Sequence, residues 1–521
     1  MPTYLSPGVY IEEMQSGTRP IEGVGTAVAA FVGLAEKGPF HTPTLVTNWS
    51  QFGQVFGDFV EGSYLALAVY GYFANGGGVC YVVRVGANGD GDGDGGSGKG
   101  GRRKALTAGE PVGLGTFRVA ALAGSGTGGG EVTVEVADPE GENPPEDRFR
   151  LLVRQGGNVV ETFDVSAKRN VRNYVVTQVR ERSKLVTVEE AAAPGALARP
   201  DKQTVTVPAP APGSAAVVPV SPQEYVGDVG NRTGFGGLEA IDEVTMVAVP
   251  DLMSAYEQGA IDAEGLKTVQ LGIIAHCELM GDRMAVLDPP PSLTPREALE
   301  WRQTGAGYDS KHATLYYPWI KVFDPSTGQN RFVPPSGHVA GVWARTDTER
   351  GVHKAPANEV LRGVVDLQMQ LTKGEQDQLN PIGVNCIRSF PGRGVRVWGA
   401  RTLSSDPAWR YLNVRRLFNY LEESILIGTQ WVVFEPNDER LWSRIRRNIY
   451  AFLVNEWRAG ALFGSTPEEA FYVKCDQETN PTEVIDAGQV VCEIGIAPVK
   501  PAEFVIFRLS QFSGGTSLIN E

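Results

Sequence analysis

The stretch EVTMVAVPDLMSAYEQGAIDAEGLKTVQLGIIAHCELMGDRMAVLDPPP, residues 243–291, decides the fold class of this chain. Its apolar runs at 244–250 and 283–287 predict buried strands, and the segment 264–280 between them predicts a helix. A further apolar run at 313–322 predicts the next strand. Strands that alternate with helices predict an α/β fold with a largely parallel sheet.

The same pattern begins earlier in the chain and is then interrupted. Strands are predicted at 26–34 and 79–85, with a helix at 63–75 between them. Residues 86–101 are almost all Gly and Asp, which predicts a solvated linker. Short strand-like runs separated by Gly and Pro follow, so we expect residues 86–235 to be an inserted, mostly β domain.

The last third of the chain combines long helices with short strands. Residues 387–402 predict a hairpin, and 412–426 and 439–458 predict amphipathic helices. The apolar runs at 431–434 and 471–474 predict strands.

Both chain ends carry strand-like segments. Val9, Tyr10, Ile11 and Glu12 predict a short strand near the N-terminus. Near the C-terminus, the run 490–496 predicts one strand, and a second follows after two prolines: Phe504, Val505, Ile506, Phe507, Arg508 and Leu509. Four consecutive large apolar residues need cover on both faces. This last strand either closes the sheet of its own domain or adds to the sheet of another subunit.

Composition excludes several classes of function. The chain has 521 residues and a formal net charge of -14, and an acidic chain is not expected to bind nucleic acid nonspecifically. The N-terminus has no basic and apolar signal-peptide regions, and no apolar run is long enough to span a membrane. The five cysteines are dispersed without a CxxC motif, which indicates reduced thiols in a cytosolic protein.

Two loop motifs in the Gly/Asp segment are incomplete. Residues 93–99 match GxxxxGK, but Gly100 stands where Ser or Thr is required. Asp90, Asp92 and Asp94 open a calcium-loop pattern whose twelfth position is Gly101 instead of Glu. We therefore expect a linker here, with no cofactor and no metal.

The best enzyme candidate lies near the ends of the predicted parallel strands. His276, Cys277 and Glu278 end a helix, and Asp251 and Asp288 follow strands, where ligands bind in such sheets. No suitable metal partner lies at i+4 from the histidine, and no nucleophile lies at a diagnostic turn. A structural role is therefore favoured over a hydrolase-like site.

An arginine stripe marks a possible docking surface. Arg440, Arg444 and Arg447 fall at i, i+4 and i+7 of the helix 439–458. The segment 381–460 holds twelve Arg against seven Asp or Glu, so it is locally about +5. The stripe is either a solvated helix face or a contact for an acidic partner.

Long strings of the sequence resemble the tail sheath proteins of contractile phages and related contractile injection systems. The resemblance covers about 1–85 and 236–521, and its main strings are SPGVYIEE (6–13), HCELMGDRMAVLDPPP (276–291), PPSGHVAGVWARTD (334–347) and NCIRSFPGRGVRVWGARTLSSDPAWRYLNVRRLFNYLEESI (385–425). It implies a subtilisin-like three-layer middle domain and a smaller α/β C-terminal domain. The expected parts are an N-terminal arm (1–25), the first part of the core (26–85), the β-rich outer domain (86–235), the middle domain (236–355), the C-terminal domain (356–502) and a C-terminal arm (503–521).

A subtilisin-like scaffold raises the question of protease activity. The H-V-A-G tract at His338 has no G-x-S turn after it, and Ser336 lies beside the histidine in sequence. No hydroxyl or thiol is placed next to a base, so we expect the scaffold without the chemistry and no enzyme.

The resemblance implies a structural subunit that assembles helically around an inner tube and contracts to drive that tube through a target envelope. Expected partners are further copies in stacked hexameric rings, the inner tube protein, and baseplate and tail terminator proteins, without nucleic acid or membrane insertion. Residues 8–14 and 503–519 are expected to add strands to neighbouring subunits, with 490–496 staying in its own domain. The arginine stripe is the expected inner-tube contact. Assembly is expected in the bacterial cytoplasm. The alternatives are a hydrolase-like enzyme and a structural protein of another assembly.

Overall fold

The computed structural model describes residues 20–86 and 220–508 and shorter segments between them, which are 112–121, 132–139, 145, 147–156, 158–169, 171, 173–183, 185–190 and 198–208. One compact unit combines the parts of the chain before 86 and after 219, and the other lies within 86–219. No helix in the described ranges is long and apolar enough to cross a membrane.

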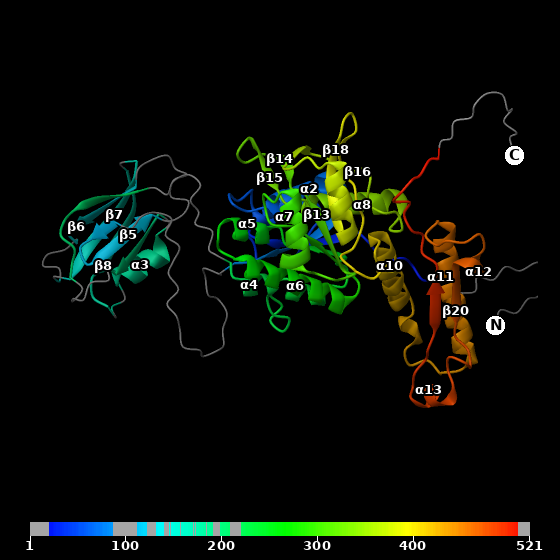
Figure 1. The fold of residues 1–521 in the computed structure, drawn as a ribbon. Coiled ribbons are helices and arrows are strands. Elements are labelled where there is room, and N and C mark those ends of the chain that lie inside the picture. Colours follow the sequence, from blue (N-terminus) through cyan, green and yellow to red (C-terminus); the bar gives the residue numbers. More distant parts are fainter. Residues whose placement is uncertain are drawn as a thin grey trace, which may run out of the picture. The chain divides into compact units, whose positions relative to one another are not determined.

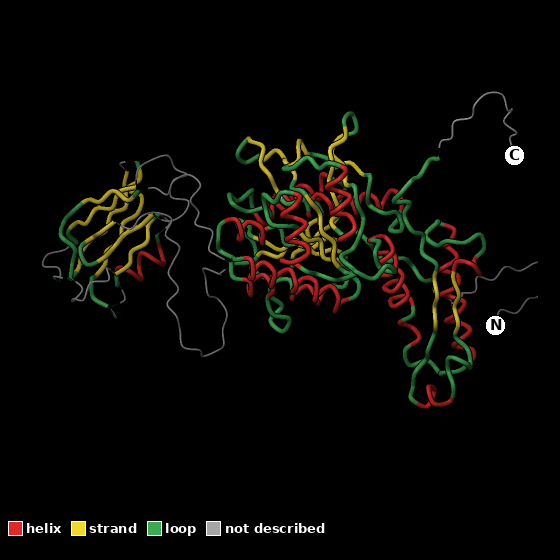
Figure 2. Tube along the Cα trace, viewed as in Figure 1, coloured by secondary structure: helices red, strands yellow, loops and turns green. Residues whose placement is uncertain are grey.

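A nine-stranded sheet forms the centre of the larger unit in the described part of the chain (Figures 1 and 2). Neighbouring strands from β18 to β3 are parallel, and the outer strands are antiparallel. Its strands, in spatial order, are β16 (Glu359–Val360), β19 (Gly394–Val397), β18 (Val384–Phe390), β13 (Ala313–Tyr317), β12 (Met284–Leu287), β11 (Met246–Ala248), β1 (Val28–Gly33), β3 (Val79–Arg84) and β2 (Thr44–Val46). The α/β prediction is confirmed.

Two groups of helices pack on this sheet. Every residue of β11, β12 and β13 is buried, so both faces of the sheet centre are covered. One group pairs α2 (Leu65–Ala74) with α8 (Ser336–Arg350), and the other packs α4 (Pro222–Val226) and α5 (Asp251–Glu257) on α6 (Ala263–Met280). Two further helices of this unit are α1 (Trp49–Phe56) and α7 (Pro295–Glu300).

Glycines let α2 and α8 approach closely. A Cβ on Gly337 would lie 2.5 Å from the backbone of Ala68, and one on Gly341 would lie 2.4 Å from the backbone oxygen of Tyr72. The G-H-V-A-G tract is therefore explained by helix packing.

The predicted strand 313–322 is two strands in two sheets. β13 ends at Tyr317, and β14 (Ile320–Asp324) pairs with β15 (Gln329–Val333) and β17 (Val364–Leu367) in a separate three-stranded sheet. Pro318 lies between them and offers no N–H to a sheet, so a continuous ladder cannot pass through it.

The central sheet extends further along the chain than the boundary at 356 suggests. The predicted hairpin at 387–402 is β18 with β19, and β18 pairs in parallel with β13 through Leu315 and Val384. α9 (Lys373–Leu379) lies in the same region and contacts β18. Residues 356–403 thus complete the central domain instead of opening the next one.

The C-terminal domain has its own core. It contains α10 (Leu412–Gly428), α11 (Glu439–Arg458), α12 (Pro467–Ala470), α13 (Thr482–Asp486) and a sheet of β20 (Phe471–Lys474) with β21 (Glu493–Ile496). Leu417, Ile445 and Phe471 are among its buried residues. The strand predicted at 431–434 is wrong: Gln430–Val432 is a 3-10 turn, and Phe434 is fully exposed with a left-handed backbone. No described strand lies beside this run to pair with it.

The smaller unit is mostly β. One sheet contains β4 (Val112–Leu114), β5 (Phe117–Ala121) and β9 (Val186–Glu190), and a second contains β6 (Val132–Ala137), β7 (Arg148–Gln155), β8 (Asn158–Ser166) and β10 (Thr204–Val207), with helix α3 (Val175–Arg182) beside them. The unit ends at 219 and not at 235, because Tyr225 and Phe235 are buried in the central core. The incomplete loop motifs at 90–101 lie outside the described residues.

Candidate functional site

The C-terminal segment leaves its domain with apolar side chains uncovered. Phe504, Val505, Ile506 and Phe507 are between 69% and 84% exposed. Residues 501–508 form no strand within this chain, and the segment extends away from the domain (Figure 1). Leu509 and the predicted N-terminal strand at Val9–Glu12 lie outside the described residues. The sequence left open whether this segment pairs in a sheet of its own domain or in a sheet of another subunit. In the single chain, its described residues do not pair in a sheet of their own domain.

Glu503 fixes the point where this segment leaves. Its carboxylate accepts hydrogen bonds from Arg401 at 2.9 and 2.6 Å and from Asn380 at 2.7 Å. Burial alone raises the pKa of Glu503, but these hydrogen bonds and the charge of Arg401 outweigh it, and the pKa lies below its ordinary value. A groove of about 930 Å³ runs beside this anchor and includes the basic side chains of Arg350, Lys354, Lys373 and Arg388.

The sheet of β20 and β21 has open edges. The two strands pair only with one another among the described residues. One face carries Phe471, Val473 and Ile494 into the C-terminal core, whereas Tyr472 points outward and is exposed. The run 490–496 thus contributes β21 to its own domain, and each strand keeps an unpaired row of backbone groups.

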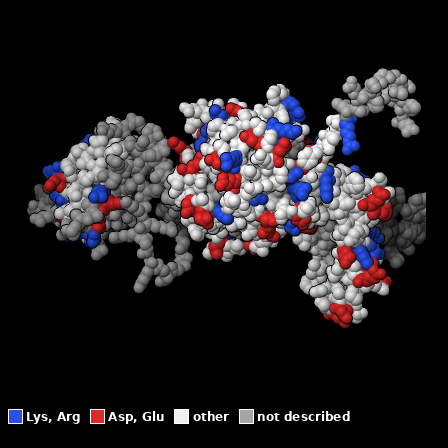
Figure 3. All heavy atoms as spheres, viewed as in Figure 1, with Lys and Arg blue, Asp and Glu red and all other residues white. Residues whose placement is uncertain are grey.

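The three arginines of the stripe lie on the outer side of α11. Arg440 and Arg447 are exposed, and Arg444 stacks on Trp431 with 4.3 Å to the ring centroid and lies 3.7 Å from Glu435. Leu441 and Ile445 on the other side are buried. Acidic and basic side chains are interspersed on the face of the molecule shown in Figure 3.

Asp251 and Asp288 cap helices. Asp251 accepts backbone N–H groups of Leu34, Tyr64 and Leu65 and so caps the start of α2. Asp288 accepts the N–H of Ser336 at 3.0 Å at the start of α8. Burial raises the pKa of Asp251 to about 6, against the effect of its hydrogen bonds, and that of Asp288 to about 7.

The histidines also have structural surroundings. His276 lies 3.4 Å from the guanidinium of Arg283 and packs on Phe235, and burial, then Arg283, lowers its pKa to about 4. The ring of His338 covers Gly71, and burial lowers its pKa to about 4. Cys277 is buried, and its thiol pKa is raised well above the usual range by that burial.

The structure therefore does not assemble the predicted catalytic candidates. In the described ranges, neither His276 nor His338 has a hydroxyl or thiol as a hydrogen-bonding neighbour, which nucleophilic catalysis requires. No group of three His, Cys, Asp or Glu in those ranges is placed to hold a metal ion.

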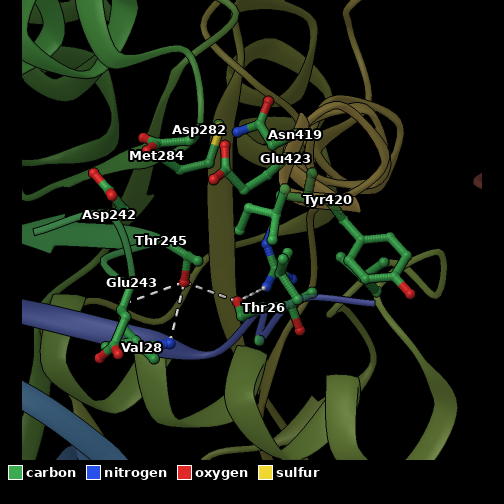
Figure 4. Close-up of a pocket in the computed structure, with 15 residues that line it drawn as sticks. Thr26, Val28, Asp242, Glu243, Thr245, Asp282, Met284, Asn419, Tyr420 and Glu423 are labelled. Atoms are coloured by element: carbon green, nitrogen blue, oxygen red, sulfur yellow. Dashed lines mark hydrogen bonds between the residues drawn. The ribbon is translucent and has the colours of Figure 1, made fainter. Parts of the chain in front are cut away.

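A cavity of about 350 Å³ lies between the central sheet and α10 (Figure 4). The hydroxyl of Thr245 donates to the carbonyl of Thr26 at 2.9 Å and accepts the N–H of Val28 at 3.1 Å along its wall. Glu423 lies on the side formed by α10, and its pKa is raised by burial and then by the nearby charges of Asp282 and Asp242. The hydroxyl of Thr26 in this lining donates to the carboxylate of Asp347 at 2.7 Å, and Asp347 is ion-paired with Arg416.

Sequence reasoning missed Glu503 as an anchor. In PVKPAEFVIF (498–507), Glu503 is the one acidic residue, and it directly precedes the apolar run. A single charge at this position could have indicated that the residue anchors the segment. Its partner Arg401 lies about a hundred residues earlier, and only the fold brings the two together.

Comparisons with known proteins identify two regions of this chain with domains of one family. Residues 230–403 match the phage tail sheath protein central domain, and residues 404–512 match the phage tail sheath C-terminal domain. The tail sheath protein of Burkholderia phage BcepMu is 26% identical over 96% of this chain and 95% of its own length. That of Vibrio phage KVP40 is 33% identical, but the match spans 35% of this chain and 27% of the relative.

A solved structure has the same fold over nearly the whole chain. The sheath of an extracellular contractile injection system, PVC, in its contracted state, is 25% identical with a TM-score of 0.56, over 98% of this chain and 99% of that one. The predicted function, a structural sheath subunit of a contractile tail-like particle, is thereby confirmed, and the hydrolase alternative is not favoured. This chain belongs to the phage tail sheath protein family.

Proposed function

We propose that this subunit polymerises by exchanging strands between neighbours, in stacked six-fold rings around an inner tube. The observation that carries the proposal is the uncovered apolar segment at 504–507, which follows directly on the anchor at Glu503. Exposed apolar runs of this kind mark interaction sites. The occupant we infer is a second copy of this chain, since its C-terminal domain has a two-stranded sheet with free edges.

In this assembly, residues 504–509 of one subunit extend the β20–β21 sheet of another, and residues 9–12 of a third extend its other edge. Each backbone hydrogen bond contributes about 0.5–1.5 kcal/mol net. Burying a Phe or Ile side chain contributes about 1.5–3 kcal/mol more. A strand of several residues thus supplies several kcal/mol at each link, repeated over many subunits.

Such links favour rigid-body motion of the subunits during contraction. The anchor at Glu503 fixes where each arm begins, so the linked subunits can rotate without losing their partners. Contraction then releases energy stored in a metastable extended lattice and needs no nucleotide. Asp251 and Asp288, the carboxylates considered for catalysis, accept backbone N–H groups at the starts of α2 and α8. This structural role supports a mechanism without catalysis by these residues. We regard the central domain as a subtilisin-like scaffold without its chemistry.

The outer side of α11 is our candidate for the inner-tube contact. Arg440 and Arg447 are exposed and have no ion-pair partner among the described residues, so they are available to an acidic surface. Contacts of exposed charges are weak and screened by salt, which suits an interface that contraction must break. Baseplate and terminator proteins complete the proposed set of partners. Assembly takes place in the bacterial cytoplasm, without nucleic acid or membrane insertion.

Electron microscopy of the full-length chain, produced alone, tests strand exchange. We expect hollow striated tubes from the natural sequence and none from the double variant Phe504→Ser/Ile506→Ser, which should remain folded. Leu279→Ser is the matched control, because Leu279 is equally exposed but lies on α6 of the central domain. Tubes formed normally by the double variant would overturn the strand-exchange mechanism.

A separate experiment tests the arginine stripe. Replacing Arg440 and Arg447 with Glu should weaken co-assembly with the inner tube protein and leave unfolding of the isolated chain within about 0.5 kcal/mol, because both side chains are exposed. Co-sedimentation with inner tubes at 50 and 300 mM salt measures this. Binding equal to that of the natural chain at both salt concentrations would remove the stripe as a contact.

A further inference from the structure

Two of the five cysteines, which are dispersed in sequence, lie one residue beyond the paired strands at the same end of the C-terminal sheet. Lys474 of β20 pairs with Glu493 of β21 in an antiparallel register. One step further along both strands places Cys475 opposite Cys492. Neither cysteine is linked to another in this structure.

The position is one where the two strands come close. The N–H of Ala497 donates to the carbonyl of Ala470 at 2.8 Å, so this pair is a hydrogen-bonded one. Pairs alternate along an antiparallel ladder, which makes 471 with 496, 473 with 494 and 475 with 492 non-hydrogen-bonded. In such pairs the Cα atoms are about 4.5 Å apart, within the range of about 4.4–6.8 Å that disulfides bridge.

The surroundings hold both cysteines in place. Cys475 is buried and Cys492 is partly exposed, and each thiol influences the pKa of the other. Asn480 lies 3.9 Å from the sulfur of Cys475 and exchanges two hydrogen bonds with the backbone of Val491, at 2.7 and 3.0 Å. The guanidinium of Arg446 donates to the carbonyl of Cys475 at 2.9 Å. Closing a bond between the sulfurs thus requires little backbone movement.

We propose that Cys475 and Cys492 form an intramolecular disulfide by exchange with a small-molecule disulfide, stapling the end of the β20–β21 sheet. The thiolate of Cys492, the more accessible residue, attacks one sulfur of the small disulfide and releases one small thiolate. Cys475 loses its proton to solvent and attacks the Cys492 sulfur, which releases the second. Two cysteines are oxidised, one small disulfide is reduced to two thiols, and no other reactant is consumed.

The exchange is slow at neutral pH. Burial, then the neighbouring Cys475, raises the pKa of Cys492 to about 12, and burial raises that of Cys475. The charged groups that face the pair are Arg446 of α11, Asp476 and Glu493. Since the thiolate reacts, the rate should rise about tenfold from pH 7.5 to 8.5.

The test uses the full-length chain, purified with reductant and then incubated with oxidised glutathione at pH 8.5. We expect the thiols that are alkylated after unfolding in denaturant to fall from five to three, and mass spectrometry to show one linked peptide pair containing 475 and 492. Five remaining thiols, a link to another cysteine, or a link between two chains would overturn the proposal.

Two variants sharpen the assignment. Cys475→Ser should retain glutathione on Cys492, because no second thiol can displace it. Cys386→Ser removes a buried cysteine of the central sheet and should still form the 475–492 link. A glutathione adduct on Cys492 that persists in the natural chain would also contradict the staple. The proposal does not depend on strand exchange, so the two tests fail independently.

Discussion

The central sheet and the C-terminal sheet differ in how far one chain completes them. In the central sheet, β11, β12 and β13 are buried on both faces, and the outer strands β16 and β2 are only two and three residues long. Short edge strands offer little to another chain. The sheet of β20 and β21 consists of edges alone within the described residues, and an exposed apolar segment follows it. Folding of one chain completes the first region, whereas it leaves the second with two strands that pair only with each other among the described residues.

This difference predicts a large effect of breaking a buried contact of the central domain, the one that Asp347 of α8 makes with α10 of the C-terminal domain. Arg416 donates to Asp347 at 2.9 Å, and both side chains are 4% exposed. Asp347→Ala leaves the guanidinium buried without its counter-charge, so we expect a loss of about 3–5 kcal/mol in the free energy of unfolding. Denaturant titration measures the loss.

The matched change in the second region is Glu478→Ala. It removes the pair of Glu478 with Lys474, whose side chains are 78% and 38% exposed, and should change unfolding by about 0–1 kcal/mol. Equal losses for Asp347→Ala and Glu478→Ala would contradict the contrast between the two regions.

Glycine substitutions compare packing in the same way and should have a smaller effect. Gly337→Ala places a methyl group 2.5 Å from the backbone of Ala68, so α2 and α8 must separate, at a cost of about 1–3 kcal/mol. Gly495→Ala in β21 meets the ring of Tyr472, which is exposed and can rotate into solvent. We expect a change within about 0.5 kcal/mol there. Thermal unfolding of both variants provides the measurement, and a greater loss for Gly495→Ala would reverse the comparison.

The contrast also explains what the sequence could predict. The mostly apolar runs at 244–250 and 283–287 are typical of strands buried on both faces, and the structure has strands there. The equally apolar run 431–434 is a turn, because strand formation depends on a neighbour that composition does not reveal. The run 313–322 divides at a proline between two sheets.

The contacts that the sequence did not predict join residues that are far apart along the chain. The pairs Arg416 with Asp347 and Arg401 with Glu503 join residues about seventy and a hundred positions apart. Strand register extended by one residue brings Cys475 opposite Cys492. The candidate catalytic residues have side chains that can act as acids, bases or nucleophiles. In the structure, however, Asp251 and Asp288 accept backbone N–H groups and cap helices.

After the losses expected for Asp347→Ala and Gly337→Ala, the smallest of the three principal effects is expected where Glu503 anchors the C-terminal arm. The folded-state pKa of Glu503 lies below its ordinary value, so its stabilising contribution is fully present above that value and is lost as pH falls through the folded pKa. Glu503→Gln keeps the shape but removes the charge, which should loosen the arm by about 1–2 kcal/mol at neutral pH. Hydrogen exchange at 502–505 should speed up, whereas exchange in β18 should not change.

The pH dependence separates this anchor from a general loss of stability. In the natural chain, exchange at 502–505, corrected for its intrinsic rate, should be steady from pH 7 to 5 and accelerate as the pH falls through the folded pKa of Glu503. In Glu503→Gln it should lack this acceleration. Glu478→Ala is again the control, since its exposed pair touches neither Arg401 nor Asn380. If arm and β18 accelerated together at low pH, the arm would unfold with the central domain, and Glu503 would not act as a separate anchor.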